Sequence, residues 1–345
     1  MKYTIFVFIF ALSILNCTKD NNPFAPNNGV WQKVGSPQGL RVEQFSFNSK
    51  GGIFITTWWH PHEYLEGAAQ YRIERSTDNG MNWLSILQTG WPVYIAIDPN
   101  DYIFAGSFGF KVKRSINNGD SWDTIIDTLP VSFIHTIAIS PEGYVYLGAN
   151  GGNYRSKDNG NSWEKLTLEY QAKAFLFLEN GIILSGVSSG HFPNPPQYMY
   201  RSANNGETWE QVLLAEYTFG WSMAVNQNGT VFAATADYDN TNGGVYRSKD
   251  NGANWTRTNN GLPSLDINSV VINSLDHIFI GIKDFGIFRS TNDGDTWVNI
   301  SDGLADLRVQ SLGMSSNDIL YVGTGTSEMP TDETESANVF LFTTN

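Results

Sequence analysis

The sequence predicts an all-β protein in which small sheets form a closed ring, and three observations support this fold class. First, the motif Arg-Ser-x-Asp/Asn-x-Gly-x-x-Trp occurs six times, at residues 75–83, 114–122, 155–163, 201–209, 247–255 and 289–297. Second, successive copies are about 40 residues apart, which leaves room for four short strands in each repeat. Third, seven segments with the alternating pattern of a first strand occur at matching places. Together they predict a seven-bladed β-propeller of four-stranded antiparallel blades.

Residues 1–16 precede this fold and have the pattern of an export signal. Lys2 provides a basic start, and the apolar run that follows is too short to cross a membrane as a helix. The run ends at Cys17, the only cysteine in the chain. This pattern resembles a bacterial lipoprotein signal, which implies a lipid on Cys17 and an outer-membrane lipoprotein facing the periplasm or the cell surface. An ordinary secretory signal with an unrelated cysteine is the alternative.

Residues 17–28 are polar and contain proline, as expected of a flexible tether. Residues 29–345 then form a single propeller domain. In each repeat a first strand such as 134–139 leads through a turn into a second strand such as 144–148. The third strand ends in the Arg-Ser of the motif, and the fourth begins at its Trp. The sequence therefore predicts a signal at 1–16, a tether at 17–28 and one domain at 29–345.

The repeated motif predicts a tight turn. Its Asp or Asn accepts hydrogen bonds from nearby backbone N–H groups, and its Gly adopts the positive φ that closes the turn. The Trp that follows is large enough to anchor the turn against its neighbours. A calcium loop is the alternative, but the Glu that such a loop needs at its twelfth position is missing.

The two ends of the chain predict how the ring closes. Residues 339–344 resemble a third strand, after which the sequence stops without a fourth. Residues 31–34, by contrast, have the pattern of a fourth strand that has no blade of its own. Pairing the two segments completes a seventh blade and covers two exposed sheet edges.

The motif resembles the Asp box, or BNR repeat, of sialidases, sortilin-type receptors, photosystem assembly factors and propeller xyloglucanases. The resemblance covers almost the whole chain after the signal. It implies a propeller in which the motif turns lie on the face away from the ligand site.

The first strands align on a column of large apolar residues, which we expect to form the core between blades. This column contains Phe45, Ile95, Ile137, Phe175, Met223, Val270 and Leu312. Two residues earlier the column reads Glu43, Val93, His135, Lys173, Trp221, Asn268 and Gln310. By strand alternation these side chains point the same way as the apolar ones, so we expect them to surround one mouth of the central channel. A ligand-binding funnel or simply a hydrated channel mouth would explain them equally well.

Variable loops that border the same mouth contain many aromatic residues. They span residues 58–64, 191–196, 237–240 and 328–333, with Trp91 and residues 216–219 nearby. Aromatic faces beside carboxylates and amides suit a sugar ring or an extended peptide. We therefore expect a glycan or a protein segment to bind here without catalysis. The expected ligand-binding residues are Glu43, Trp58, Trp59, His135, Lys173, Trp221, Asn268 and Gln310.

A glycoside hydrolase is the alternative function. The resemblance to sialidases implies an arginine clamp for a carboxylate, but outside the motif only Arg41 and Arg308 fall near the mouth. Other glycosidases use two carboxylates across a cleft. The candidates for that role are Glu43, Glu63, Glu216, Asp237 and Asp239.

Composition and motifs limit the other kinds of partner that we expect. The formal net charge of -13 disfavours binding to nucleic acid or to anionic lipid headgroups. We expect membrane contact only through the lipid, and a monomer. His60, His62 and Glu63 suggest zinc ligands, but no further ligand is apparent, so we expect no metal. No phosphate-binding loop or cysteine-based site occurs, and we expect no cofactor.

Overall fold

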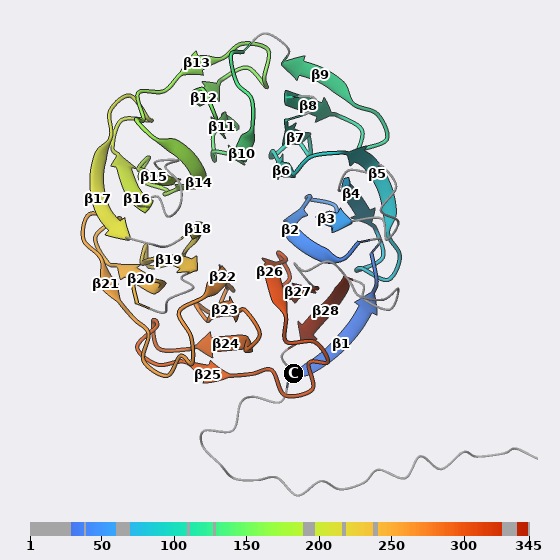
Figure 1. The fold of residues 1–345 in the computed structure, drawn as a ribbon, viewed down its shortest axis with the longest axis vertical. Coiled ribbons are helices and arrows are strands. Elements are labelled where there is room, and N and C mark those ends of the chain that lie inside the picture. Colours follow the sequence, from blue (N-terminus) through green and yellow to red (C-terminus); the bar gives the residue numbers. More distant parts are fainter. Residues whose placement is uncertain are drawn as a thin grey trace, which may run out of the picture.

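The computed structural model describes residues 29–37, 39–59, 70–108, 111–126, 129–188, 197–215, 219–236, 241–325 and 337–343. These residues form seven four-stranded antiparallel sheets, arranged around a central axis as the blades of a propeller (Figure 1). The predicted seven-bladed all-β fold is confirmed. In the described part of the chain, no helix is long and apolar enough to cross a membrane.

Each blade runs from an innermost strand beside the axis to an outermost strand at the rim (Figure 1). In that order, blades 1 to 3 contain β2 (Arg41–Phe47), β3 (Ile53–Trp59), β4 (Gln70–Ser76) and β5 (Leu84–Thr89); β6 (Val93–Ile97), β7 (Ile103–Ser107), β8 (Lys111–Ser115) and β9 (Asp123–Ile126); and β10 (Ile134–Ile139), β11 (Val145–Ala149), β12 (Gly152–Ser156) and β13 (Glu164–Lys165).

The remaining blades follow the same plan. Blades 4 to 7 contain β14 (Gln171–Phe177), β15 (Ile183–Ser188), β16 (Gln197–Ser202) and β17 (Glu210–Ala215); β18 (Phe219–Val225), β19 (Val231–Ala236), β20 (Gly244–Ser248) and β21 (Thr256–Arg257); β22 (Ile267–Ile272), β23 (Ile278–Ile282), β24 (Gly286–Ser290) and β25 (Val298–Asn299); and β26 (Val309–Met314), β27 (Leu320–Thr324), β28 (Asn338–Thr343) and β1 (Val30–Gly35).

Blade 7 takes its outermost strand from the opposite end of the chain. Strand β1 pairs antiparallel with β28, so that the first and last described strands lie side by side (Figure 1). The Trp31 ring packs on Phe342 with the ring centroids 4.7 Å apart. Its Nε1 donates a hydrogen bond to the Ile300 carbonyl in the neighbouring blade, at 2.8 Å. The predicted closure of the ring is confirmed.

The motif turns have the expected hydrogen bonds. In the first copy, Ser76 Oγ accepts a bond from the Gly80 N–H and donates one to Asp78 Oδ1, at 2.9 and 2.8 Å. Asp78 Oδ1 also accepts the Asn82 N–H at 2.9 Å. Gly80 has φ 89°, and Asn79 before it has φ 58°. All six copies repeat this arrangement, so the motif serves local structure.

The motif arginines connect one turn to the next around the ring. Each donates to the backbone carbonyl of the residue before Gly in the following motif. The pairs are Arg75 to Asn118, Arg114 to Asn159, Arg155 to Asn205, Arg201 to Asn251 and Arg247 to Asp293. The series ends at Arg289, because blade 7 has no motif. These five arginines hold neighbouring blades together on the motif face.

Neighbouring blades also interlock near the axis. An apolar residue at the start of an innermost strand packs on the second strand of the preceding blade, in several blades against a glycine. Ile134 fits against Gly106 in this way, and Val42 fits against Gly323. A Cβ built on Gly323 would lie 2.5 Å from the Val42 Cβ, so no larger residue fits there. We call this place on the innermost strand the interblade position.

Residues 1–28 lie outside the described residues. The expected signal, the lipid on Cys17 and the tether therefore stay predictions.

Candidate ligand site at the channel mouth

A cavity of about 540 Å³ opens where the innermost strands begin. All seven blades contribute to it, and we call it the mouth cavity. The motif turns follow the ends of the third strands, whereas Tyr71, which lines the cavity, lies near the start of a third strand. The cavity and the motif turns therefore lie on opposite faces. The charged and amide side chains in its lining are Arg41, Glu43, Gln44, Lys173, Asn268 and Gln310.

β-Bulges, and not simple strand alternation, bring Glu43, Lys173, Asn268 and Gln310 to the mouth cavity, so the expectation of simple alternation was wrong. In blade 1, Val42 pairs with Thr57 and Gln44 with Thr56, which leaves Glu43 as an extra residue. The other irregular pairings of this kind occur at His135, Lys173, Trp221, Asn268 and Gln310. Val42 is consequently buried and Glu43 exposed.

Blade 2 is the exception to this rule. Strand β6 pairs regularly with β7, so it contains no bulge. Val93 is 4% exposed and takes the interblade position, so it does not belong with the polar residues. The spacing of apolar residues marks this difference: Val93 and Ile95 are two residues apart, whereas Ile134 and Ile137 are three apart. A spacing of three is therefore the sequence signal for a bulge, which the assumption of simple alternation did not take into account.

Blades 1 and 2 contribute a compact polar group. Arg41 Nε lies 2.5 Å from Glu43 Oε1, and its guanidinium lies over the Trp58 ring, 5.1 Å from the ring centroid. Burial and the nearby carboxylate of Glu43 raise the pKa of Tyr94 to about 12, and the same two causes raise the pKa of Tyr71. Both phenols therefore keep their protons at neutral pH and can donate hydrogen bonds.

Blades 3 and 4 contribute a cation and a neutral imidazole. Burial lowers the pKa of Lys173 to about 8. Burial, followed by the charge of Lys173, lowers the pKa of His135. His135 Nε2 lies 2.7 Å from Asn150 Oδ1, and His135 is not itself among the residues that line the cavity. No described residue forms a hydrogen bond or ion pair with the Lys173 ammonium.

Two amide side chains from blades 6 and 7 are held in place by backbone groups. Asn268 Nδ2 donates to the Val309 carbonyl at 2.8 Å, and Gln310 Nε2 donates to the Gly325 carbonyl at 3.0 Å. Among the described residues, none donates to the oxygen of either amide. Both oxygens are therefore available to accept an N–H or O–H from a ligand.

Trp221 has a mainly structural setting. It is 9% exposed and packs on Gly186 of the preceding blade, where an added Cβ would lie 2.3 Å from its Cγ. Trp221 therefore fills the interblade position, because Gly220, the residue before it in the strand, has no side chain. Trp221 borders the mouth cavity, but most of its surface contacts protein.

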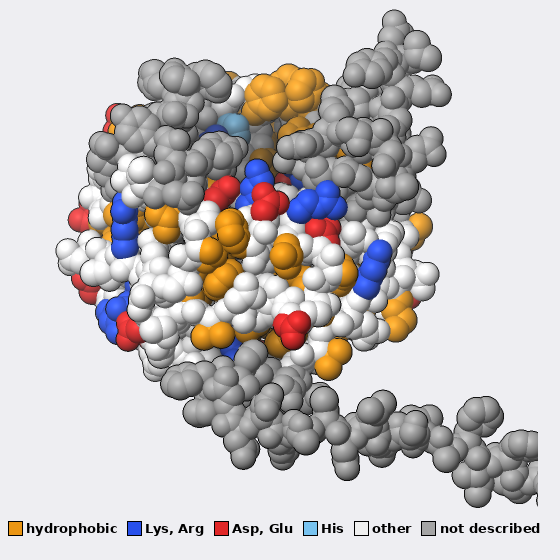
Figure 2. All heavy atoms as spheres, turned by 60° about the horizontal axis from the view of Figure 1, so that its bottom comes forward, with side chains coloured by type: hydrophobic (Ala, Val, Ile, Leu, Met, Phe, Trp, Pro, Cys, Tyr) orange, Lys and Arg blue, Asp and Glu red, His pale blue; other side chains and the backbone are white. Residues whose placement is uncertain are grey.

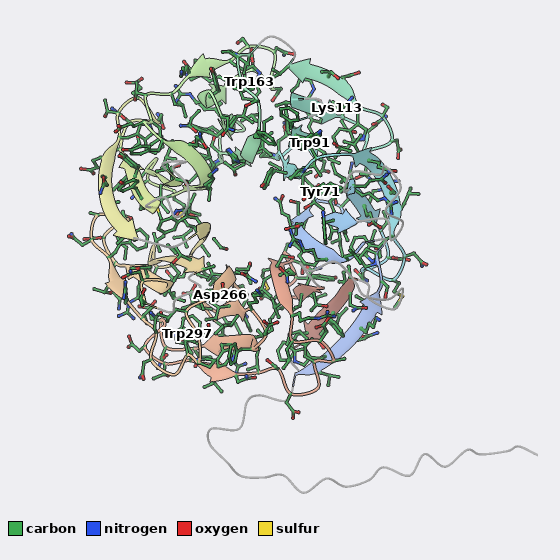
Figure 3. The ribbon with its side chains drawn as sticks, viewed as in Figure 1. Tyr71, Trp91, Lys113, Trp163, Asp266 and Trp297 are labelled. Carbon is green, nitrogen blue, oxygen red and sulfur yellow. The ribbon has the colours of Figure 1, made fainter. Side chains whose placement is uncertain are left out.

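An exposed aromatic cluster beside the cavity was only partly predicted. Trp91, Phe108 and Phe133 contact one another, with ring centroids 4.7, 5.6 and 4.5 Å apart for the three pairs. The sequence pointed to Trp91 alone, because the other two are single phenylalanines at strand ends. In Figure 3, Trp91 and Tyr71 lie nearer the axis than the motif residues Trp163 and Trp297.

The residues proposed for catalysis are only partly described. Glu43 is the only carboxylate among the described residues that line the cavity, and Arg41 is the only arginine. Arg308 pairs with Asp306, at 3.0 Å from Nε to Oδ1. Outside the described residues lie Glu63, Glu216, Asp237 and Asp239, the histidines His60 and His62, and the side chain of Trp59. Within the described residues, no cluster of His, Cys, Asp and Glu is placed to bind a metal.

Comparison with known proteins identifies the repeat. A family model described as photosynthesis system II assembly factor YCF48 matches residues 120–342. None of the curated proteins compared with the chain matches it.

Several solved structures share the fold. YCF48 bound to D1 peptide has a TM-score of 0.66 at 15% identity, with 91% of this chain and 97% of that chain covered. YCF48 from Cyanidioschyzon merolae has a TM-score of 0.62 at 11% identity, with 91% and 98% covered. A Niastella koreensis GH74 enzyme has a TM-score of 0.62 at 18% identity, with 86% of this chain covered but only 53% of the enzyme. At these identities the likeness concerns the fold.

Proposed function

The chain belongs to the family of photosynthesis system II assembly factor YCF48, a family of BNR-type β-propellers, and we propose that it binds an extended segment of a partner protein at the mouth cavity. The observation that carries this proposal is the mixed lining of the cavity. An extended segment presents backbone N–H and C=O groups at every residue, together with side chains of several kinds. The cavity offers amide oxygens from Asn268 and Gln310, phenol donors from Tyr71 and Tyr94, and apolar walls.

A relative supports the same class of ligand. YCF48 has been solved bound to D1 peptide, so a propeller of this family holds a protein segment. In the present chain, the side chains at the mouth would determine which segment binds.

We also propose that Cys17 carries a lipid that anchors the propeller in the bacterial envelope, as an outer-membrane lipoprotein. The proposal rests on the apolar run that ends at the only cysteine. Cys17→Ser should move the protein from the membrane fraction to the soluble exported fraction. Membrane association that persists in Cys17→Ser would contradict the anchor.

A glycan is the second candidate ligand, with glycoside hydrolysis as its enzymatic form. The exposed face of Trp91 favours it, since sugar rings stack on such faces. Incubating the protein with a panel of oligosaccharides tests both forms. Turnover that Glu43→Gln abolishes would replace the peptide proposal with an enzymatic one.

A photo-crosslinking experiment tests the peptide proposal directly. A benzophenone amino acid replaces Trp58 at the mouth or, as the control, Leu275, which is 67% exposed in the turn between β22 and β23 on the opposite face. Synthetic peptides should crosslink from position 58 and not from position 275. The double variant Trp58→Ala/Trp59→Ala should bind peptides at least about tenfold more weakly, because stacking on each aromatic contributes on the order of 1 kcal/mol. Equal crosslinking at both positions would contradict the site.

A further inference from the structure

The aromatic cluster of Trp91, Phe108 and Phe133 is an apolar surface held in shape before any ligand arrives. The three side chains are 43, 39 and 37% exposed, so a large part of each ring faces solvent. They come from the connection before β6, the end of β7 and the connection before β10, and the rings of Phe108 and Phe133 are stacked. Because the rings pack on one another, their conformations are already restricted. An incoming side chain would therefore bury apolar area without the entropic cost of ordering the three rings.

Lys173 provides an uncompensated positive charge in the mouth cavity. The other charged groups of the described lining are Arg41 and Glu43, which neutralise each other at 2.5 Å. His135 is neutral at pH 7, because burial and Lys173 both lower its pKa. The described lining therefore has one net positive charge, in a chain whose formal net charge is -13. An acidic ligand group is repelled by most of the surface and attracted here.

A continuous path joins the cluster to this cation. Phe133 and His135 are two residues apart, and Asn150 contacts both. The Asn150 N–H donates to the Phe133 carbonyl at 2.8 Å, and Asn150 Oδ1 lies 2.7 Å from His135 Nε2. Besides burial, the positive charge of Lys173, on the next blade, in turn lowers the pKa of His135. In Figure 2, hydrophobic side chains gather at the upper edge of the view.

We propose that the mouth selects a protein segment in which an Asp or Glu side chain binds Lys173 while an aromatic or large aliphatic side chain packs on Trp91, Phe108 and Phe133. This inference rests on the proposed function and adds the chemistry of the segment. The segment would cross blades 2, 3 and 4, with the neutral imidazole of His135 between its two contacts. Binding would replace the water around Lys173 by a carboxylate, which forms a charge-assisted hydrogen bond with the ammonium.

Fluorescent peptides with acetylated N-termini and amidated C-termini test the acidic contact. The panel pairs a Phe with Glu, Gln or Lys at several spacings, and replaces the Phe by Ala in a second set. Wild type should bind the Glu–Phe peptides about tenfold more tightly than the Gln–Phe peptides. Lys173→Met should abolish this preference, and Lys173→Glu should reverse it towards Lys–Phe. Melting curves of both variants establish that they are folded.

The apolar contact has its own variant and control. Phe108→Ser/Phe133→Ser should remove the preference for Phe over Ala, and Leu275→Ser on the opposite face should leave it intact. Peptides that bind at the mouth but keep both preferences in all variants would overturn this inference and leave the proposed function standing. Binding that appears only when the same peptides are made with a free C-terminus would likewise overturn the side-chain contact. Failure of every peptide to bind, with binding of an oligosaccharide, would overturn the proposed function itself.

Discussion

At the scale of single residues, the motif turn accepts either aspartate or asparagine at the same place. Asp250 Oδ1 accepts the Asn254 N–H at 2.9 Å, and Asn292 Oδ1 accepts the Thr296 N–H at 3.0 Å. A neutral carbonyl oxygen is therefore enough for the geometry. The carboxylate adds pH dependence, because hydrogen bonds from Asn254 and Ser248 lower the pKa of Asp250 to about 2.

The acid stability of the fold should depend on the motif aspartates. Since the folded pKa of Asp250 lies below its ordinary value of 3.8, its contribution is present above that value and disappears as the pH falls towards about 2. Asp250→Asn should melt within a few degrees of wild type at pH 7 and lose less stability between pH 4 and pH 2. Asn292→Asp is the reciprocal control and should lose more. Identical pH profiles of all three proteins would contradict this account.

Lys173 should reduce the stability of the fold at neutral pH. Burial lowers its folded pKa to about 8, whereas the unfolded value is 10.5, so folding opposes the charged form. The contribution of Lys173 to stability should therefore become more favourable as the pH increases from 8 to 10.5. Lys173→Met should melt a few degrees higher than wild type at pH 7, with the difference shrinking above pH 10. A lower melting temperature for Lys173→Met at pH 7 would show that Lys173 has a stabilising partner.

At the scale of strands, the β-bulge separates structural side chains from those at the mouth. The residue before each bulge takes the interblade position, as Ile267 does, and the bulged residue, such as Asn268, faces the channel. One strand can therefore hold the ring together and vary its ligand contacts independently. Blade 5 departs from this plan, since Trp221 itself fills the interblade position.

Two tryptophans near the mouth should consequently behave differently. Trp221→Ala leaves a cavity between blades 4 and 5 and should reduce the free energy of unfolding by about 3 kcal/mol or more. Trp58→Ala, whose ring faces Arg41, should change stability less and weaken peptide binding more. Chemical denaturation and peptide titration measure the two effects. A Trp221→Ala variant with unchanged stability and weakened peptide binding would contradict this structural role and place the residue in the ligand site.

At the scale of the whole molecule, the ring depends on one pairing between its two ends. Strand β1 covers the edge of β28, and Trp31 connects blade 7 to blade 6. Because every blade packs on two neighbours, loss of this pairing affects the whole ring.

Deleting residues 29–35 should therefore lower the melting temperature of the entire propeller and promote association through the exposed β28 edge. Trp31→Ala, which retains the strand, should have a smaller effect in the same direction. Calorimetry and light scattering record the two outcomes. A deletion variant that melts as wild type does would mean that the ring closes without β1.

The repeated turn, the number of blades and the closing strand could all be predicted from the sequence. Each depends on residues close together in the chain or on a pattern repeated at a regular period, as in residues 75–83 and 289–297. The bulges could have been predicted too, since Ile134 and Ile137 are three residues apart. The expectation of strict alternation instead grouped Val93 and Trp221 with the polar residues, although both fill interblade positions.

The sequence by itself determined the fold. Each repeat contains the residues for its own turn hydrogen bonds and the apolar spacing of its own strands, so each four-stranded blade is specified locally. Only the tertiary structure decided which of the expected side chains line the mouth cavity and which aromatic residues lie beside them. Phe133 and His135 belong to blade 3 and Lys173 to blade 4, and Trp91 meets Phe108 and Phe133 from separate connections. Contacts between blades depend on how much each strand bends and twists. The sequence pattern of one repeat does not specify which side chains of the next repeat it will contact.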